Sequence, residues 1–265
     1  GALTFNASVF YYDYKGYQIS EIVDRTSINL NFDAHVKGAE VEATWEPLPG
    51  LRFNFAGGYE ATRINNGEKA VDLMDRTDVA NHPDWLILRP FVTQASNCIL
   101  PDYVIAYLNF DGSALGNGPH GDGYCAEAYL RHVDPVTDQP YDPDNPPTVS
   151  ARGNPIAPGT YPGFDPFSAP NNGAGFDKEL GGNELPNAPH FTVSVGAQYS
   201  VPLSSDWAGT LRGDFYWQDK SWARVFNDDP YDRIHGYTNF NLALILTSQS
   251  GWQVMLYDKN VFNTT

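Results

Sequence analysis

Hydrophobic and polar residues alternate in two regions of the chain, and a long irregular stretch separates these regions. Alternation with a period of two is the pattern of a β-strand that has one apolar and one polar face. In the opening strand, Leu3, Phe5, Ala7, Val9 and Tyr11 share one face, while Thr4, Asn6, Ser8, Phe10 and Tyr12 share the other. Seven segments of this kind predict strands at about 3–22, 33–46, 51–63, 188–202, 208–220, 237–248 and 252–262.

The connections between these segments alternate in length. Short turns with the sequences EPLPGL, PLSSDWAG and TSQSG interleave with longer polar links at 24–33 and 220–236, and with one very long link at about 64–187. Short links at one end of a sheet and long links at the other are typical of outer-membrane barrels. A soluble sandwich would show the same alternation within each strand, so the loop lengths and the aromatic residues at strand ends favour the barrel.

The middle region is rich in Pro, Gly, Asn and Asp, and this composition predicts no second hydrophobic core. Two stretches, DRTDVANHPDWLILRPFV and CILPDYVIAYL, have enough apolar residues for a short helix or two, packed on the rim or mouth of the barrel. Because loops of this length usually have a function, we expect the region to be an extracellular loop with a role of its own.

Composition and charge exclude some classes of protein. The chain has 16 basic and 32 acidic residues, a formal net charge of -16, whereas a nucleic-acid surface needs a basic patch. The longest apolar runs are too short for a membrane-spanning helix. The first residues, GALTFNAS, lack the features of a signal peptide, so either export is not needed or the true start lies upstream.

The chain has two cysteines, Cys98 and Cys125, in one polar segment. We expect a disulfide between them, which would contribute roughly 3–4 kcal/mol in an oxidising compartment. Two free thiols are the alternative, and the absence of neighbouring Cys or His pairs argues against a zinc site.

Five segments of the chain together resemble the C-terminal part of a TonB-dependent outer-membrane receptor. They are ALTFNASVFYYDYKGYQ, GAEVEATWEPLPGLRFNFAGGYEATR, ELPNAPHFTVSVGAQYSVPL, GTLRGDFYWQDKSWARVFN and GYTNFNLALILTSQSGWQVMLYDKNVFN. The resemblance covers about 1–63 and 184–263, and the loop segment RPFVTQASNCILP is similar to loops in some receptors of this family.

This resemblance implies an all-β, antiparallel transmembrane barrel of 22 strands, of which this chain supplies about seven. It implies energy-coupled uptake of a scarce nutrient, such as a siderophore or a carbohydrate, in the outer membrane of a Gram-negative bacterium. The implied partners are membrane lipid, the rest of the barrel with its plug, the TonB complex and a small-molecule or oligosaccharide ligand. The sequence lacks the plug, the TonB-contacting segment and the last strand, so we expect its first and last strands to be unpaired edges or to pair with other polypeptide.

Candidate ligand contacts follow from position. We expect them on the lumen face near the outer mouth and among the aromatic residues of the long loop, although each could equally line a hydrated wall. The candidates are Glu60, Arg63, Asp214, Tyr216 and Gln218 on the strands, and Trp85, Tyr103 and Tyr107 in the loop.

Aromatic residues are also expected at the membrane interface. In the opening strand, Tyr11 is predicted to face outward at the outer headgroup level, while Phe10 and Tyr12 point into the barrel. The full set of predicted interface aromatics is Tyr11, Trp45, Tyr199, Trp217 and Trp252.

Catalytic and metal sites are weaker hypotheses. Glu40 and Glu42 could be a glycosidase acid and base, but two positions apart on one strand they simply share the lumen face. The segment DPDN at 142–145, with Asp134 and Asp138, lacks the spacing of a calcium loop, and His190 has no metal-ligand partner. We therefore expect no catalytic residue, no metal and no cofactor.

The sequence thus favours a transport protein and not an enzyme. The main alternative is a secreted soluble β-sandwich that binds glycans through its many aromatic residues. A secreted hydrolase of β architecture is a third and weaker hypothesis.

Overall fold

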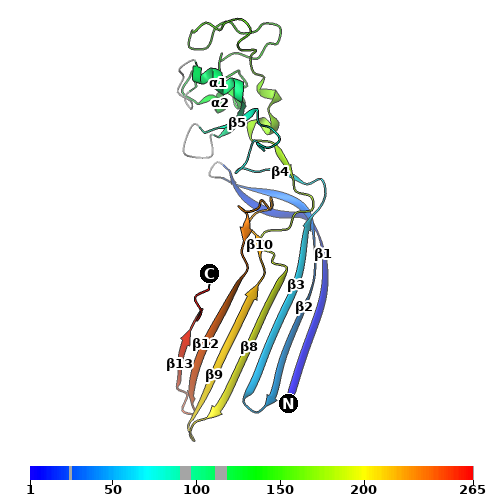
Figure 1. Ribbon diagram of the computed structural model, residues 1–265, viewed down its shortest axis with the longest axis vertical. Coiled ribbons are helices and arrows are strands. Elements are labelled where there is room, and N and C mark those ends of the chain that lie inside the picture. Colours follow the sequence, from blue (N-terminus) through cyan, green and yellow to red (C-terminus); the bar gives the residue numbers. More distant parts are fainter. Residues whose placement is uncertain (24–25, 90–96, 111–117, 265) are drawn as a thin grey trace. The chain divides into compact units, whose positions relative to one another are not determined.

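The computed structural model describes residues 1–23, 26–89, 97–110 and 118–264, and its fold is all-β. It divides into two compact units (Figure 1). The first, here called the sheet unit, comprises Gly1–Tyr17, Phe32–Glu68 and Leu180–Thr265; the second, the middle unit, comprises Gln18–Asn31 and Lys69–Glu179. Most of the loop segment RPFVTQASNCILP falls at 90–96, outside the described residues.

Seven strands form one antiparallel sheet, in the order β1-β2-β3-β8-β9-β12-β13 (Figure 1). Each strand therefore lies beside the one that follows it among these seven along the chain. The strands are β1 (Ala2–Val23), β2 (Thr26–Leu48), β3 (Leu51–Ile64), β8 (Phe191–Pro202), β9 (Trp207–Gln218), β12 (Tyr237–Ser248) and β13 (Gln253–Asp258).

The seven strands lie where the alternating pattern predicts them, with two differences. β2 begins at Thr26 and not near 33, so most of the predicted polar link at 24–33 is strand. A polar sequence can extend a strand because backbone hydrogen bonds, and not apolar side chains, join neighbouring strands. β13 ends at Asp258 and not near 262, at the position where the alternation slips.

Within the described part of the chain, β1 and β13 each have a neighbour on one side only. This agrees with the expectation that the first and last strands are edges of the sheet. Exposed edges of long strands present unpaired backbone groups and favour pairing with further polypeptide.

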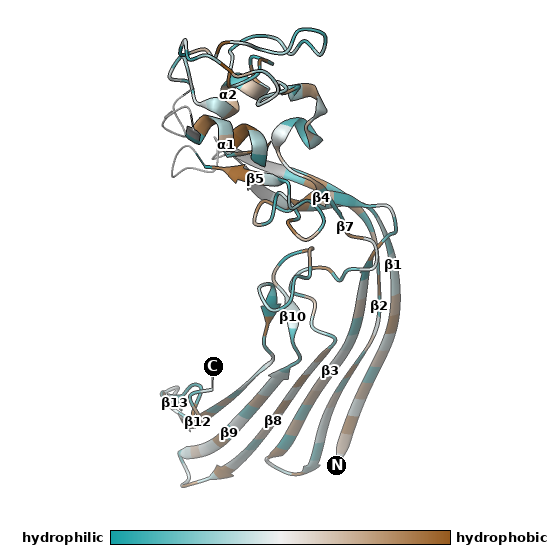
Figure 2. Ribbon diagram, turned by 45° about the horizontal axis from the view of Figure 1, so that its top comes forward, coloured by the Kyte–Doolittle hydropathy of each residue, from teal (hydrophilic) through white to brown (hydrophobic). Residues whose placement is uncertain are grey.

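One face of the sheet is apolar and exposed, and Figure 2 shows hydrophobic and hydrophilic residues alternating along the strands. Val9 is 84 % exposed, Leu211 59 % and Leu256 63 %. Cross-strand partners keep the residues of this face together, as Phe55 pairs with Val195 and Val195 with Phe215. The large apolar side chains of this face are therefore not in a buried core.

The opposite face of the sheet is polar and internally bonded. The Arg212 guanidinium donates two hydrogen bonds of 2.7 Å to the Asp214 carboxylate. The Tyr216 hydroxyl donates to the Gln218 side-chain oxygen at 2.9 Å. Side chains of this face are therefore hydrogen-bonded to one another, as expected for a polar surface open to solvent.

The middle unit has a hydrophobic core of its own, and the prediction of no second core was wrong. Fully buried residues such as Leu100, Val104, Tyr124 and Phe164 pack together, and the Tyr129 hydroxyl donates to the Ile99 carbonyl at 2.5 Å. Some of these residues have helical spacing, such as Val104, Ile105 and Leu108 within α1, but prolines and glycines separate the segments that carry them, so the local pattern does not reveal that they converge.

A disulfide between Cys98 and Cys125 lies within this core, with their Cα atoms 5.7 Å apart. It joins β6, which leads into α1, to α2. The elements of the middle unit are β4 (Lys69–Val71), β5 (Trp85–Leu88), β6 (Cys98–Pro101), α1 (Asp102–Phe110), α2 (Tyr124–Tyr129), η2 (Pro166–Ser168), η3 (Pro170–Gly173) and β7 (Asp177–Glu179).

Of the two stretches expected to form a helix, only CILPDYVIAYL does so, as β6 followed by α1. The described part of the other stretch, 75–89, forms turns and then β5, which pairs with β6 through Leu86 and Leu100. Asp78 has a φ of 45°, and Pro83 follows it, so a helix cannot run through this stretch. No helix among the described residues is long and apolar enough to cross a membrane.

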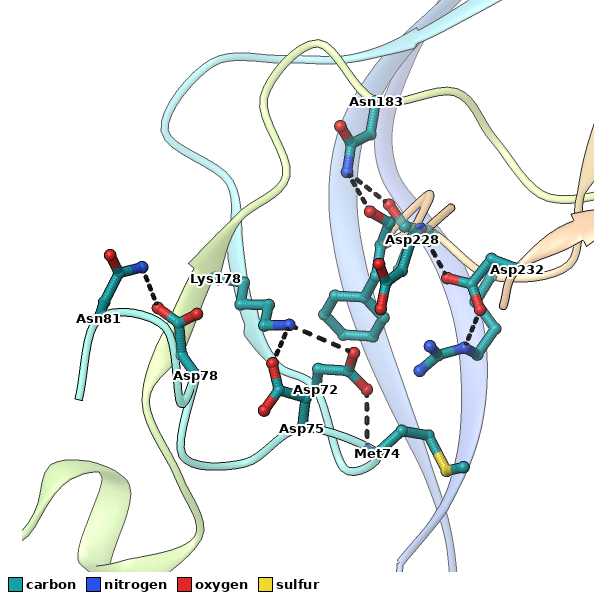
Figure 3. A network of polar contacts seen from close by, with 12 residues as sticks. Asp72, Met74, Asp75, Asp78, Asn81, Lys178, Asn183, Asp228 and Asp232 are labelled. Carbon is teal, nitrogen blue, oxygen red and sulfur yellow. Dashed lines mark hydrogen bonds and ion pairs between the residues drawn. The ribbon is translucent and has the colours of Figure 1, made fainter. Parts of the chain in front are cut away.

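Polar contacts fix the smaller elements within each unit (Figure 3). In the middle unit, the Lys178 amine lies 2.7 Å from the carboxylate of Asp75 and 3.7 Å from that of the fully buried Asp72. In the sheet unit, Arg224 and Asp232 form an ion pair of 2.6 Å beside the short hairpin of β10 (Ser221–Trp222) and β11 (Arg233–Ile234).

Candidate functional site

A pocket of about 480 Å³ lies on the polar face of the sheet unit. β1 supplies a run of aromatic residues, and β2 and β3 supply two carboxylates. The segment 185–188, which precedes β8, forms the remaining side. We call this the aromatic pocket, and its key side chains are Phe10, Tyr12, Tyr14, Tyr17, Glu40 and Glu60.

Four aromatic rings follow one another along β1. The ring centroids are 5.4 Å apart for Phe10 and Tyr12, 5.9 Å for Tyr12 and Tyr14, and 5.9 Å for Tyr14 and Tyr17. Tyr12 is 51 % exposed and Tyr14 40 % exposed, so their faces are open to a ligand.

Tyr17 joins this row because of Gly16. Strict alternation would place residue 17 on the face opposite Tyr12 and Tyr14. Gly16 has a φ of 65°, in the left-handed region, and its N–H donates to the Asp33 carboxylate at 3.0 Å. This conformation shifts the register by one residue, as a bulge does, and returns Tyr17 to the row.

Gly16→Ala is expected to lower the free energy of unfolding by about 1–2 kcal/mol, because an L side chain is strained in the left-handed region. No atom lies within 4 Å of the added Cβ, so the effect is conformational and not steric. The measurement is denaturant unfolding of the purified protein. Gly213→Ala is the matched control, since it has no left-handed φ and its Cβ makes ordinary contacts from 3.4 Å; equal losses in the two variants would contradict the explanation.

The wall beneath the aromatic row is fixed by close packing. A Cβ at Gly38 would lie 2.5 Å from the Cζ of Phe10, so the Phe10 ring lies directly over this glycine. Gly38 pairs with Glu60 across β2 and β3. A residue with no side chain at position 38 therefore lets the first ring of the row approach the sheet.

The carboxylates of the aromatic pocket are close neighbours on one face. Glu40 pairs with Gly58 and Glu60 with Gly38, so the two side chains are diagonal neighbours across β2 and β3. Within residues 1–23, 26–89, 97–110 and 118–264, neither carboxylate forms a hydrogen bond or an ion pair. The pocket therefore holds two uncompensated negative charges.

The segment beside β3 is held in place by backbone and side-chain bonds. The Leu185 N–H donates to the Thr62 hydroxyl at 2.9 Å, and the Asn187 N–H donates to the Trp222 carbonyl at 2.8 Å. Asn183 donates to the carbonyls of Val225 and Phe226 at 2.8 and 3.1 Å (Figure 3). This side of the aromatic pocket is thus preformed.

Of the strand residues proposed as ligand contacts, the structure brings Glu60 alone into the aromatic pocket. Asp214, Tyr216 and Gln218 lie on the same polar face, but on β9. Asp214 is paired with Arg212, and Tyr216 with Gln218, so these groups already have partners within the wall.

Arg63 does not lie on the face of Glu60, so the two candidates cannot line the same wall, and the role of Arg63 as a ligand contact stays a prediction. Arg63 pairs with His35 across β2 and β3, and the His35 ring stacks on Tyr11 at 6.3 Å. Since residues 60 and 63 are an odd number of positions apart on a regular strand, they must face opposite sides.

The loop candidates Trp85, Tyr103 and Tyr107 belong to the middle unit, where their contacts are structural. Trp85 and Tyr107 pack against its hydrophobic core. The Tyr103 hydroxyl donates to the Gly163 carbonyl at 3.2 Å, and burial raises its pKa to about 12. Their role as ligand contacts stays a prediction.

The structure places Phe10 and Tyr12 on one face of β1 and Tyr11 on the other, as the alternation predicts, and the location of the first face inside a barrel stays a prediction. Phe10 and Tyr12 line the pocket that holds Glu40 and Glu60, whereas Tyr11 contacts His35 on the other face. Their level relative to a membrane stays a prediction. Among the other proposed interface aromatics, Trp45, Tyr199 and Trp252 are exposed, and Trp217 is half-buried.

Five residues of the pocket were not among the ligand contacts expected from the sequence: Phe10, Tyr12, Tyr14, Tyr17 and Glu40. The aromatic cluster of β1 was expected to mark the membrane interface. The signal that separates the two interpretations is the face: Phe10, Tyr12 and Tyr14 alternate onto the same side as the polar residues, where lipid would not contact them.

The acidic segment considered for calcium is held by its own turn contacts. Asp142 accepts hydrogen bonds from the Asp144 N–H at 3.0 Å and from the Asn145 amide at 2.8 Å, and these bonds lower its pKa. Asp134 lines the same pocket as Asp142 and Asn145, but it is buried and accepts a hydrogen bond from the Tyr161 hydroxyl at 2.8 Å. The described residues contain no group of three or more His, Cys, Asp or Glu that could hold a metal ion.

Comparison with known proteins gives no match: no protein-family model, no curated protein and no solved structure matches this chain. The resemblance to TonB-dependent receptors therefore rests on the sequence segments alone.

Proposed function

We propose that this chain forms part of the barrel wall of a TonB-dependent receptor that imports a scarce nutrient across a bacterial outer membrane. One observation supports the proposal most strongly. The sheet has an apolar face that is exposed across its strands, with Leu3 at 67 %, Phe5 at 63 % and Leu211 at 59 %. A contiguous exposed apolar surface of this kind favours contact with lipid or with another protein.

A soluble β-sandwich would bury this face against a second sheet. In the part of the sheet unit that the structure describes, the only other sheet is the two-stranded β10–β11 hairpin, which has two residues in each strand. A sheet that small does not cover seven strands. The exposed face therefore favours the membrane interpretation over the sandwich.

Strand length is also consistent with a membrane wall. β8, β9 and β12 each have 12 residues. At about 3.3 Å per residue and a tilt of about 45°, such a strand crosses roughly 28 Å, close to the thickness of a hydrocarbon core. The polar face would then be the lumen wall, where the aromatic pocket lies open to a nutrient.

The disulfide of the middle unit supports the same location. Disulfides persist in oxidising compartments such as the periplasm and the cell surface. In the proposed receptor, the middle unit is the long connection between two strands on the extracellular side.

Membrane fractionation and purification test the proposal. We expect the protein to be recovered from the outer-membrane fraction and to stay monodisperse only in detergent. A protein that remains monodisperse in buffer without detergent would overturn the transport proposal and favour the soluble glycan-binding sandwich. Polysaccharide turnover that is lost in both Glu40→Gln and Glu42→Gln would favour the hydrolase.

A further inference from the structure

We propose that the aromatic pocket binds a compact organic cation, such as a quaternary ammonium compound or a protonated amine. This inference rests on the proposed function, because it names the class of ligand that the lumen wall would receive. Three features of the pocket support this inference: its charge, the arrangement of its rings and its size.

The charge of the pocket is negative and is not neutralised. Glu40 and Glu60 are diagonal neighbours on β2 and β3, and among the described residues that line the pocket none is Lys, Arg or His. Lys15, the nearest cation along β1, instead lies 3.2 Å from the Asp33 carboxylate and 3.6 Å from that of Asp13. An anionic ligand is therefore disfavoured, and a cation would relieve the repulsion between the two carboxylates.

The rings add a second attraction for a cation. Phe10, Tyr12, Tyr14 and Tyr17 form a continuous row along the same pocket, with centroids 5.4 to 5.9 Å apart. The face of an aromatic ring attracts a positive charge, and several rings around one site are the usual means of recognising quaternary ammonium groups. Rings and carboxylates together thus select a ligand that is positively charged and only weakly hydrated.

A neutral sugar is the main competing ligand, because it also stacks on aromatic rings. A sugar would leave the two carboxylates uncompensated, whereas a cation would neutralise at least one of them. The pocket has about 480 Å³, within the range of small-molecule sites and large enough for a substituted ammonium ion.

The test is a calorimetric titration of the purified protein with choline and with 3,3-dimethylbutan-1-ol, which has the same shape without the charge. We expect choline to bind more tightly than the neutral isostere, and its affinity to fall as salt is raised. Maltotriose serves as the neutral sugar. Isostere binding as tight as that of choline, maltotriose binding without choline binding, or no choline binding would each overturn the proposal.

Substitutions of pocket residues test whether choline binds in the aromatic pocket. Glu60→Gln is expected to weaken choline binding about tenfold, and Tyr12→Leu about three- to fivefold. The matched controls are Glu42→Gln, on the same strand face as Glu40 but outside the pocket, and Tyr11→Leu, on the opposite face. Unchanged binding in Glu60→Gln and Tyr12→Leu, or an equal loss in the controls, would show that choline does not bind here.

This experiment can fail independently of the transport proposal. Choline binding with the expected variant effects, in a protein that needs no detergent, would support the cation site and refute the receptor. A membrane protein that binds maltotriose and not choline would support the receptor and refute the cation site.

Discussion

Val195→Arg is expected to lower the free energy of unfolding in lipid vesicles by about 2–4 kcal/mol, the cost of placing an arginine on the lipid face of a barrel near the bilayer midplane. Val195 is 38 % exposed, lies within β8 and pairs with Phe55 and Phe215 on the apolar face. Denaturant titration of the protein refolded into vesicles gives the measurement.

Ser194→Arg is the matched control, because the neighbouring side chain lies on the polar face, where it pairs with Ala56 and Tyr216. A charge there is in contact with water, so we expect a change within about 0.5 kcal/mol, as for surface substitutions in general. If Val195→Arg is as mild as Ser194→Arg, the apolar face does not contact lipid, and the receptor proposal loses its main support.

Removing the disulfide is expected to destabilise the middle unit by about 3–4 kcal/mol, the chain-entropy value for a loop of this length. Cys98 and Cys125 are 27 positions apart, and both lie within the hydrophobic core. The double variant Cys98→Ser, Cys125→Ser should therefore become more sensitive to denaturant and to protease between residues 69 and 179. Hydrogen exchange of α1 and α2 reports the same change locally.

A reducing agent provides the control for this prediction, since the chain has only 2 cysteines. The reduced wild-type protein and the double variant should unfold at similar denaturant concentrations. A loss below about 1 kcal/mol in both would mean that the core holds the unit together without the covalent link.

The aromatic pocket is the part of the sheet unit to which we assign ligand binding. Its side chains come from three adjacent strands and from a segment more than 120 residues further along the chain, as shown by the hydrogen bond from Leu185 to Thr62 with a sequence separation of 123. In the proposed receptor, this wall would present a preformed site without a mobile element. A pocket variant that loses choline binding but keeps its stability would show that the substituted side chain is needed for binding and not for folding.

Much of the sheet could be predicted from the sequence. Alternation with a period of two locates each strand, because the side chains of a half-exposed strand must separate by polarity. Short turns such as the one at Gly50, which has a φ of 79°, then force consecutive strands to be antiparallel neighbours. Because residues 60 and 63 are an odd number of positions apart, alternation also places Arg63 on the face opposite Glu60.

The core of the middle unit could not be predicted in this way. Leu100, Tyr124 and Phe164 have no common period, and they converge because turns and a disulfide fold the chain back on itself. A pattern that is local in sequence carries no information about such contacts. The composition was therefore interpreted as that of a loop, although it contains enough apolar residues for a small core.

The sequence by itself determined the strands, their two faces, the orientation of Phe10, Tyr11 and Tyr12, and the proximity of the two cysteines in one segment. Local alternation and turn chemistry are sufficient for these features. Only the tertiary structure decided that Glu40 and Glu60 are neighbours, that Gly16 returns Tyr17 to the aromatic row, and that the middle region has a core. Those features depend on the register between strands and on the backbone conformation at single residues. Both are fixed by contacts between residues that are far apart in the sequence.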